Sequence, residues 1–89
     1  MPTIRLALVD DHKLFLEGMV AVLSKEIDIE VVDFFNTAKE ALSKLDFEDI
    51  DLLITDISMP EMNGLEFVNQ VNKKNPNLKI LVISMFQQI

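Results

Sequence analysis

Residues 52–64 read LLITDISMPEMNG, an apolar run that stops at the carboxylate of Asp56 and continues into a turn containing proline and glycine. The bulky residues before Asp56 predict a short buried strand bounded by turn signals. An Asp at the carboxyl end of such a strand lies where open α/β sheets bind their ligands. The simpler interpretation is a strand-end or helix-capping Asp, which is the usual role of this residue in a turn. The remaining sequence has to decide between these interpretations.

The composition is that of one small folded domain. The chain has 89 residues, of which 49% are hydrophobic and 26% are charged, so we treat residues 1–89 as a single domain. It has no cysteine, which excludes a disulfide framework and a thiolate metal site. The sequence has neither an apolar run long enough to cross a bilayer nor a leader like a signal peptide. We therefore expect a cytoplasmic protein with no membrane partner.

The charge distribution argues against a nucleic-acid surface. The formal net charge is −7, and the eight Lys and Arg residues occur singly or in pairs. Phosphate binding requires clustered Lys and Arg side chains. The pair Lys73-Lys74 falls late in a predicted helix, where cations complement the helix dipole. No direct contact with nucleic acid is therefore expected from this segment.

Strand and helix patterns alternate along the chain. Strands are predicted at residues 4–9, 29–35, 52–55 and 79–84, and helices at residues 13–25, 37–45 and 64–75. Thr37 and Glu40 form a capping-box pattern at the start of the second helix. The expected buried positions are Phe15, Leu16, Met19, Val20, Val22 and Leu23 in the first helix, and Leu65, Phe67, Val68 and Val71 in the third.

This alternation predicts an α/β fold. Strands that are apolar on both faces and separated by helices imply a doubly wound parallel sheet covered on both sides. In the flavodoxin-like strand order 2-1-3-4, the first and third strands are neighbours. Their carboxyl ends carry Asp10, Asp11 and Asp56. The three carboxylates are therefore expected to converge at one edge of the sheet.

A cluster of carboxylates has a chemical use when a cation lies among them. Like charges raise one another's pKa values unless a cation compensates them, and oxygen-only ligands suit Mg²⁺. One carboxylate of such a site can act as a nucleophile toward phosphorus, while the metal offsets the charge of the transferring phosphoryl group. Three acidic caps pointing into water are the alternative. Their convergence after two adjacent apolar strands favours a site.

The motifs resemble those of the receiver domain of bacterial two-component response regulators. The matching residues are Asp10-Asp11, the pattern Asp56-x-x-Met59-Pro60-x-Met62-x-Gly64, and Ser84 at the end of the fourth strand. The resemblance extends over residues 4–86. Residues 9–12 (VDDH) further resemble regulators that carry a helix-turn-helix output domain.

The resemblance implies a role for each matching position. Asp56 would be the phosphoacceptor, phosphorylated by a sensor histidine kinase. Asp10, Asp11 and Asp56, with the backbone carbonyl of Ser58, would hold Mg²⁺, and Ser84 would be the switch hydroxyl that bonds the phosphoryl oxygen. The implied protein is a phosphorelay signalling module that controls a DNA-binding output and hence transcription; it is a regulatory domain rather than an enzyme. His12 is interpreted as a helix-start residue with an exposed ring.

The sequence departs from the receiver pattern after the fourth strand. The resemblance implies a further helix, a fifth strand bearing a lysine and an aromatic switch residue, and a last helix, which these 89 residues do not contain. We therefore interpret the chain as the amino-terminal portion of a receiver domain. Residues 80–83 would form an apolar sheet edge, and such edges pair with other chains. We expect dimerisation or exchange of elements through this strand.

Two alternatives remain open. The chain could be a non-phosphorylatable fragment of a response regulator that acts by dimerisation or interaction. It could also be a Mg²⁺-dependent phosphatase with an Asp nucleophile. The phosphatase interpretation is weakened because Ser58 stands two residues after Asp56, where a second carboxylate could serve as general acid.

Overall fold

The computed structural model describes residues 3–57, 59 and 61–83. Its elements follow in the order β1 (Ile4–Val9), α1 (Lys13–Leu23), β2 (Ile29–Phe35), α2 (Ala38–Lys44), β3 (Leu52–Asp56), α3 (Gly64–Lys74) and β4 (Lys79–Ile83). The strands are parallel and lie in the order β2-β1-β3-β4. The predicted flavodoxin-like fold and strand order are confirmed. The ends of the described elements lie within two residues of the predicted ones, and the predicted end of the fourth strand at Ser84 lies outside the described residues.

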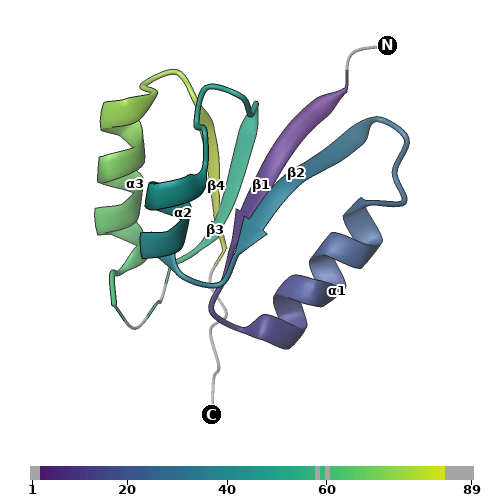
Figure 1. Ribbon diagram of the computed structural model, residues 1–89, viewed down its shortest axis with the longest axis horizontal. Helices are drawn as coiled ribbons and strands as arrows, with labels where there is room; N and C mark the ends of the chain where they lie inside the picture. The colour runs from purple at the N-terminus through teal and green to yellow at the C-terminus, as the bar shows by residue number, and fades with distance from the viewer. Residues whose placement is uncertain (1–2, 58, 60, 84–89) are drawn as a thin grey trace.

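The fold has three layers, with the sheet in the middle. Figure 1 shows α1 on one face of the sheet and α2 and α3 on the other. Because all strands run in the same direction, their carboxyl ends lie together, at the lower end of the view. The amino terminus of α1 lies at that same end (Figure 1). This end of the sheet is where ligands bind in open α/β folds.

The side chains of the central strands alternate between two cores. Ala7, Val9 and Leu53 pack with residues of α2 and α3. Leu6, Leu8 and Ile54 pack with Leu16 of α1 on the opposite face. Successive side chains of a strand point to opposite faces, so two buried faces require apolar residues at every position. This explains the apolar runs at residues 6–9 of β1 and 52–54 of β3.

Local signals in the sequence place α2 and its connector. The Thr37 hydroxyl accepts a hydrogen bond from the Glu40 backbone N–H at 3.1 Å, which confirms the predicted cap at the start of α2. In the acidic connector before β3, Phe47 and Ile50 are buried in the core under α2 and α3. The connector is therefore tied to the sheet by two apolar anchors.

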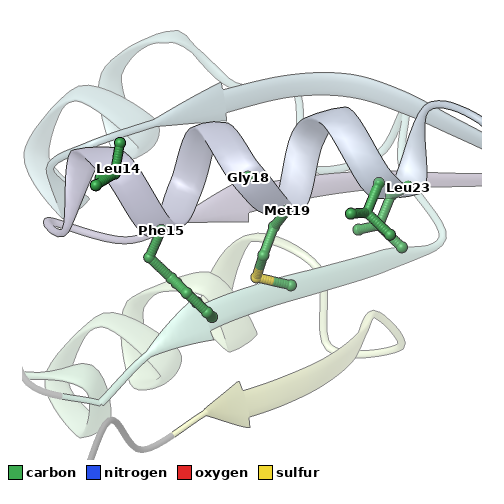
Figure 2. A pocket seen from close by; sticks show the side chains of 6 residues that line it. Leu14, Phe15, Gly18, Met19 and Leu23 are labelled. Atoms are coloured by element: carbon green, nitrogen blue, oxygen red, sulfur yellow. The ribbon is translucent and has the colours of Figure 1, made fainter.

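Two predictions of burial were wrong. Leu65 of α3 is 65% exposed, because the buried face of that helix runs through Gly64, Phe67 and Val71. Val22 of α1 is 63% exposed, and Leu16 is the residue of that helix that is fully buried. An apolar groove runs along α1 (Figure 2), lined by Leu14, Phe15, Gly18, Met19, Val22 and Leu23.

The strand β4 lies at one edge of the described sheet. Its residues Leu81 and Val82 are 53% and 39% exposed. Exposed apolar edges favour pairing with another strand. Dimerisation through β4 stays a prediction, because the structure contains one chain.

Candidate functional site

Strand register places two carboxylates side by side at the end of the sheet. Val9 of β1 is paired with Thr55 of β3, so Asp10 and Asp56 follow at the same level. Asp56 continues the alternation of Ile54 and therefore lies on the face that α1 covers. Both residues are buried, with exposures of 3% for Asp10 and 1% for Asp56. Burying a carboxylate costs several kcal/mol unless other groups compensate, on the order of the whole stability margin of a small domain.

Four side chains form what we call the carboxylate cluster: Asp10, Asp11, His12 and Asp56. One ligand atom from each of them lies within 4.8 Å of every other. The Nδ1 atom of His12 is 2.9 Å from Asp10 Oδ1, 3.2 Å from Asp11 Oδ1 and 3.5 Å from Asp56 Oδ2. The His12 backbone N–H also donates to Asp10 Oδ1, at 2.8 Å. The strand ends and the first residue before α1 thus converge on one point.

The cluster favours positive charge at that point. The hydrogen bond with Asp10 raises the pKa of the His12 imidazole above its usual value, against the opposing effect of desolvation. The negative charges of Asp11, Asp10 and Asp56 raise the pKa further. A cation is therefore stabilised between the carboxylates.

The donor atoms fit an oxygen-preferring divalent cation. Asp10 Oδ2 is buried and accepts no hydrogen bond from any residue in the described part of the chain. A buried carboxylate oxygen without a donor is costly, and a metal ion is one of the few groups that compensate it. Mg²⁺ prefers carboxylate oxygens and keeps several waters. Asp10, Asp11 and Asp56 therefore suit this ion in chemistry and spacing.

The loop after Asp56 is fixed by close contact with α3. The Gly64 backbone N–H donates to the Ile57 carbonyl oxygen at 2.6 Å, and Ile57 N–H donates to the Ile83 carbonyl at 3.0 Å. A Cβ atom on Gly64 would lie 2.5 Å from Ile57 Cα, closer than real Cβ atoms approach backbone. Met59 is buried in the core with α2 and α3. The glycine of the motif is therefore required for space, and it holds the segment that carries Asp56.

The structure brings together three of the predicted site residues and adds one. Asp10, Asp11 and Asp56 converge as the order of the strands predicted. Ser58 and Ser84 lie outside the described residues. His12 precedes α1 as predicted, and its side chain is half exposed, but its ring reaches all three carboxylates. The signal that could have identified it is its place directly after Asp10-Asp11, at the entry to a helix on the same face of the sheet.

Comparison with known proteins decides the family. The family model of the response regulator receiver domain matches residues 6–89. The chain belongs to this family. Response regulator protein VraR of Staphylococcus aureus is 37% identical over 84 residues, a match that covers 94% of this chain and 40% of VraR. The chain therefore spans well under half the length of this relative.

Solved receiver domains share the fold. The receiver domain of the putative response regulator NarL from Mycobacterium tuberculosis is 28% identical, with a TM-score of 0.84, over 99% of this chain and 71% of that one. The isolated REC domain of RcsB from Salmonella enterica serovar Typhimurium was solved in the presence of the phosphomimetic BeF₃⁻. It is 27% identical, with a TM-score of 0.84, over 97% of this chain and 64% of that one. Within the described part of the chain, no helix is long and apolar enough to cross a membrane.

Proposed function

We propose that this receiver domain accepts a phosphoryl group on Asp56 from the phosphohistidine of a sensor histidine kinase. The observation that carries the proposal is the position of Asp56, buried at the carboxyl end of β3 with its carboxylate beside those of Asp10 and Asp11. Membership of the receiver family supports the same role. The REC domain of RcsB, solved with a phosphomimetic, is a structural neighbour of the chain.

The transfer is a displacement at phosphorus. A carboxylate oxygen of Asp56 forms the new bond to phosphorus as the phosphorus–nitrogen bond of the phosphohistidine breaks. The bonding electrons return to the imidazole nitrogen, which takes up a proton as the phosphate leaves it. The product is an acyl phosphate on Asp56. The carboxylate must be ionised to act, and a cation in the cluster favours that form.

The neighbouring carboxylates prepare the site for this step. Asp10 and Asp11, together with Asp56 and (by the family resemblance) the backbone carbonyl of Ser58, would hold Mg²⁺. When bound, this ion supplies positive charge that offsets the charge on the phosphoryl group. The buried position of Asp10 fixes its carboxylate beside Asp56 and keeps bulk water from it. Ser84 is proposed, again by resemblance, as the hydroxyl that binds the phosphoryl group.

The proposed consequence of phosphorylation is regulatory. Receiver domains exchange signals with histidine kinases and with their own output domains, and RcsB has been solved in a complex with DNA. We propose that phosphorylation of this domain controls a DNA-binding output in a cytoplasmic two-component system. The net charge of −7 makes a direct DNA contact by this segment unfavourable. The phosphoryl group would act by shifting a two-state equilibrium of the domain.

A mass measurement tests phosphoacceptance. The chain is incubated with Mg²⁺ and acetyl phosphate, and its intact mass is compared with those of Asp56→Asn and Asp28→Asn. Asp28 is exposed, precedes β2 and lies outside the carboxylate cluster, so it is the matched control. We expect one phosphoryl adduct on the wild-type chain and on Asp28→Asn, and none on Asp56→Asn. An adduct that survives Asp56→Asn would contradict the proposal, and steady hydrolysis of many phosphate esters would favour a phosphatase instead.

The second candidate function is an interaction fragment that is not phosphorylated. The exposure of Leu81 and Val82 on β4 favours it, because this edge of the described sheet offers apolar side chains and backbone groups to another strand. It predicts self-association without a phosphoryl donor, measured by sedimentation, which Leu81→Lys abolishes. A monomer at all concentrations, with a normal Asp56 adduct, would exclude it.

A further inference from the structure

The turn into α3 places side by side two residues that form a chemically labile pair. Asn63 is the N-cap of α3, and its side chain accepts a hydrogen bond from the Glu66 backbone N–H at 2.9 Å. Gly64 follows, and a Cβ atom at that position would lie 2.5 Å from Ile57 Cα. The fold therefore requires a capping residue and then a glycine. Ser, Thr, Asp and Asn are all suitable N-caps, and Asn is the one whose side chain is an amide.

An Asn-Gly pair loses its side-chain amide by a reaction within the chain. The backbone nitrogen of Gly64 gives up its proton and bonds to Asn63 Cγ, and ammonia leaves with the side-chain nitrogen. Water then opens the succinimide ring at either carbonyl carbon, which leaves aspartate or isoaspartate at position 63. Glycine favours ring closure because it has no side chain beside the attacking nitrogen. The other asparagines precede larger residues and serve as internal references: Asn36, Asn69, Asn72, Asn75 and Asn77.

The folded turn holds this pair in an unreactive arrangement. The Gly64 backbone N–H donates to the Ile57 carbonyl oxygen at 2.6 Å, and Gly64 is buried, so base cannot reach the proton that has to leave. The backbone of Asn63 is extended, with φ −71° and ψ 161°, and its carboxamide oxygen is bound to the Glu66 N–H. Ring closure breaks both hydrogen bonds. The reaction therefore requires the turn to open.

We propose that Asn63-Gly64 is a deamidation site kept unreactive by the contact of Gly64 with Ile57, and that its isoaspartate product releases the loop that carries Asp56. Isoaspartate routes the main chain through the former side chain and so inserts an extra carbon atom before Gly64. The Gly64 nitrogen then loses its place against the Ile57 carbonyl. Aspartate, in contrast, keeps the normal main chain and remains a good N-cap, which the helix dipole also favours.

The first test compares deamidation of Asn63 in the folded chain with deamidation in the chain unfolded by concentrated urea. Both samples are kept in the same mildly alkaline buffer, and peptide mass spectrometry follows the amide-to-acid conversion at each asparagine. Because the chemistry is slow relative to reclosing of the turn, the folded-state rate is the unfolded-state rate multiplied by the open fraction. We expect Asn63 to react at least about tenfold more slowly in the folded chain. In urea it should react faster than every reference asparagine.

Equal rates at Asn63 in the two states, or no reaction there in urea, would overturn the proposal. Hydrogen exchange, measured by NMR, provides a second check, because exchange of the Gly64 amide also requires loss of its bond to Ile57. The deamidation rate should be reduced by folding at least as strongly as the Gly64 exchange rate is. A weaker reduction would show that the ring closes within the folded turn and would equally overturn the proposal.

The consequence for the loop is tested on the separated products. The isoaspartate form is isolated by chromatography from urea-treated protein, refolded, and compared with Asn63→Asp, which has the sequence of the aspartate product. Asn69→Asp is the matched control, because it adds the same charge at an exposed position of α3 away from its cap. We expect a lower urea midpoint and faster Gly64 exchange in the isoaspartate form, and protected Gly64 amides in both variants.

An isoaspartate form with the midpoint and the Gly64 protection of Asn63→Asp would overturn the release of the loop. None of these measurements uses a phosphoryl donor. Their outcomes are therefore independent of whether Asp56 accepts a phosphoryl group, and a chain that forms no adduct would leave them unchanged.

Discussion

The two ends of the sheet use the same kinds of charged residue in opposite ways. At the amino end, the Arg5 guanidinium is 2.8 Å from Asp49 Oδ2 and 2.9 Å from Glu30 Oε1, and the Arg5 backbone N–H donates to Asp51 Oδ2 at 2.9 Å. The Arg5 side chain is 36% exposed, and the side chains of Glu30 and Asp49 are about half exposed. At the carboxyl end, the side chains of Asp10 and Asp56 are 4% and 0% exposed.

The two ends of the sheet differ in how the negative charges of their carboxylates are compensated. The amino-end carboxylates are paired with the Arg5 guanidinium and remain in contact with water. Their desolvation therefore costs little free energy, and their ion pairs contribute little to the stability of the fold. The carboxyl-end carboxylates are buried and share one imidazole. Burying charges in this way is costly for a fold alone unless another group compensates them. The comparison indicates that the amino end is structural and the carboxyl end is built for a ligand.

The largest expected effect is on cation binding. Asp10→Asn should lower the affinity for Mg²⁺ and Mn²⁺ by about 10- to 100-fold, because it removes a buried anionic ligand. Titration calorimetry measures both ions. Asp49→Asn, at the amino end, is the control and should leave both affinities unchanged. Equal losses in the two variants would mean that the ends do not differ as described.

The second effect concerns the loop that carries Asp56. Gly64→Ala should lower the free energy of unfolding by about 1–3 kcal/mol, because the new Cβ meets Ile57 backbone and the segment must shift. Gly18→Ala is the matched control: it lies within α1 with nothing near its Cβ position among the described atoms, and it should raise the free energy of unfolding by about 0.5–1 kcal/mol. Urea unfolding measures both variants. Equal changes of the same sign would refute the assignment of Gly64 to a spatial role.

A smaller effect is expected at the amino end. Arg5→Gln should destabilise the chain less than Gly64→Ala does, since its ion pairs with Glu30 and Asp49 are exposed. The loss should shrink further in concentrated salt, which screens exposed charges. Urea unfolding at low and high salt measures it. A large loss that is insensitive to salt would show that the amino end is a strongly coupled network.

The smallest effect is the titration of His12 without divalent ions. Proton NMR of this single imidazole should give a pKa above the ordinary value of 6.5, and Asp10→Asn should lower it, because the hydrogen bond that the Asp10 carboxylate accepts from the imidazole is the main cause of the shift. A raised folded-state pKa means that the stabilisation is fully present below pH 6.5 and is lost as the pH rises through the folded-state value. An unshifted pKa would show that the imidazole ring does not interact with the carboxylates in solution.

Sequence patterns predicted those features that depend on strand order and alternation. Asp10 and Asp56 end two apolar strands that a doubly wound sheet places side by side, so their convergence followed from topology. Leu65 was assigned to the core because it is apolar, but the buried stripe of α3 passes through Gly64, which has no apolar side chain to mark it. The contacts of His12 depend on the angle at which α1 leaves β1, and that angle is set by packing between layers. A local pattern does not contain this information.

The most direct test is to locate the phosphoryl group within the chain. After incubation with acetyl phosphate and Mg²⁺, borohydride reduces an acyl phosphate on Asp to homoserine, and tandem mass spectrometry identifies the modified position. The difference between the two ends predicts homoserine at position 56 and unmodified carboxylates at Glu30, Asp49 and Asp51. Modification at the amino end, or spread over both ends, would contradict the proposal that the carboxyl-end cluster accepts the phosphoryl group.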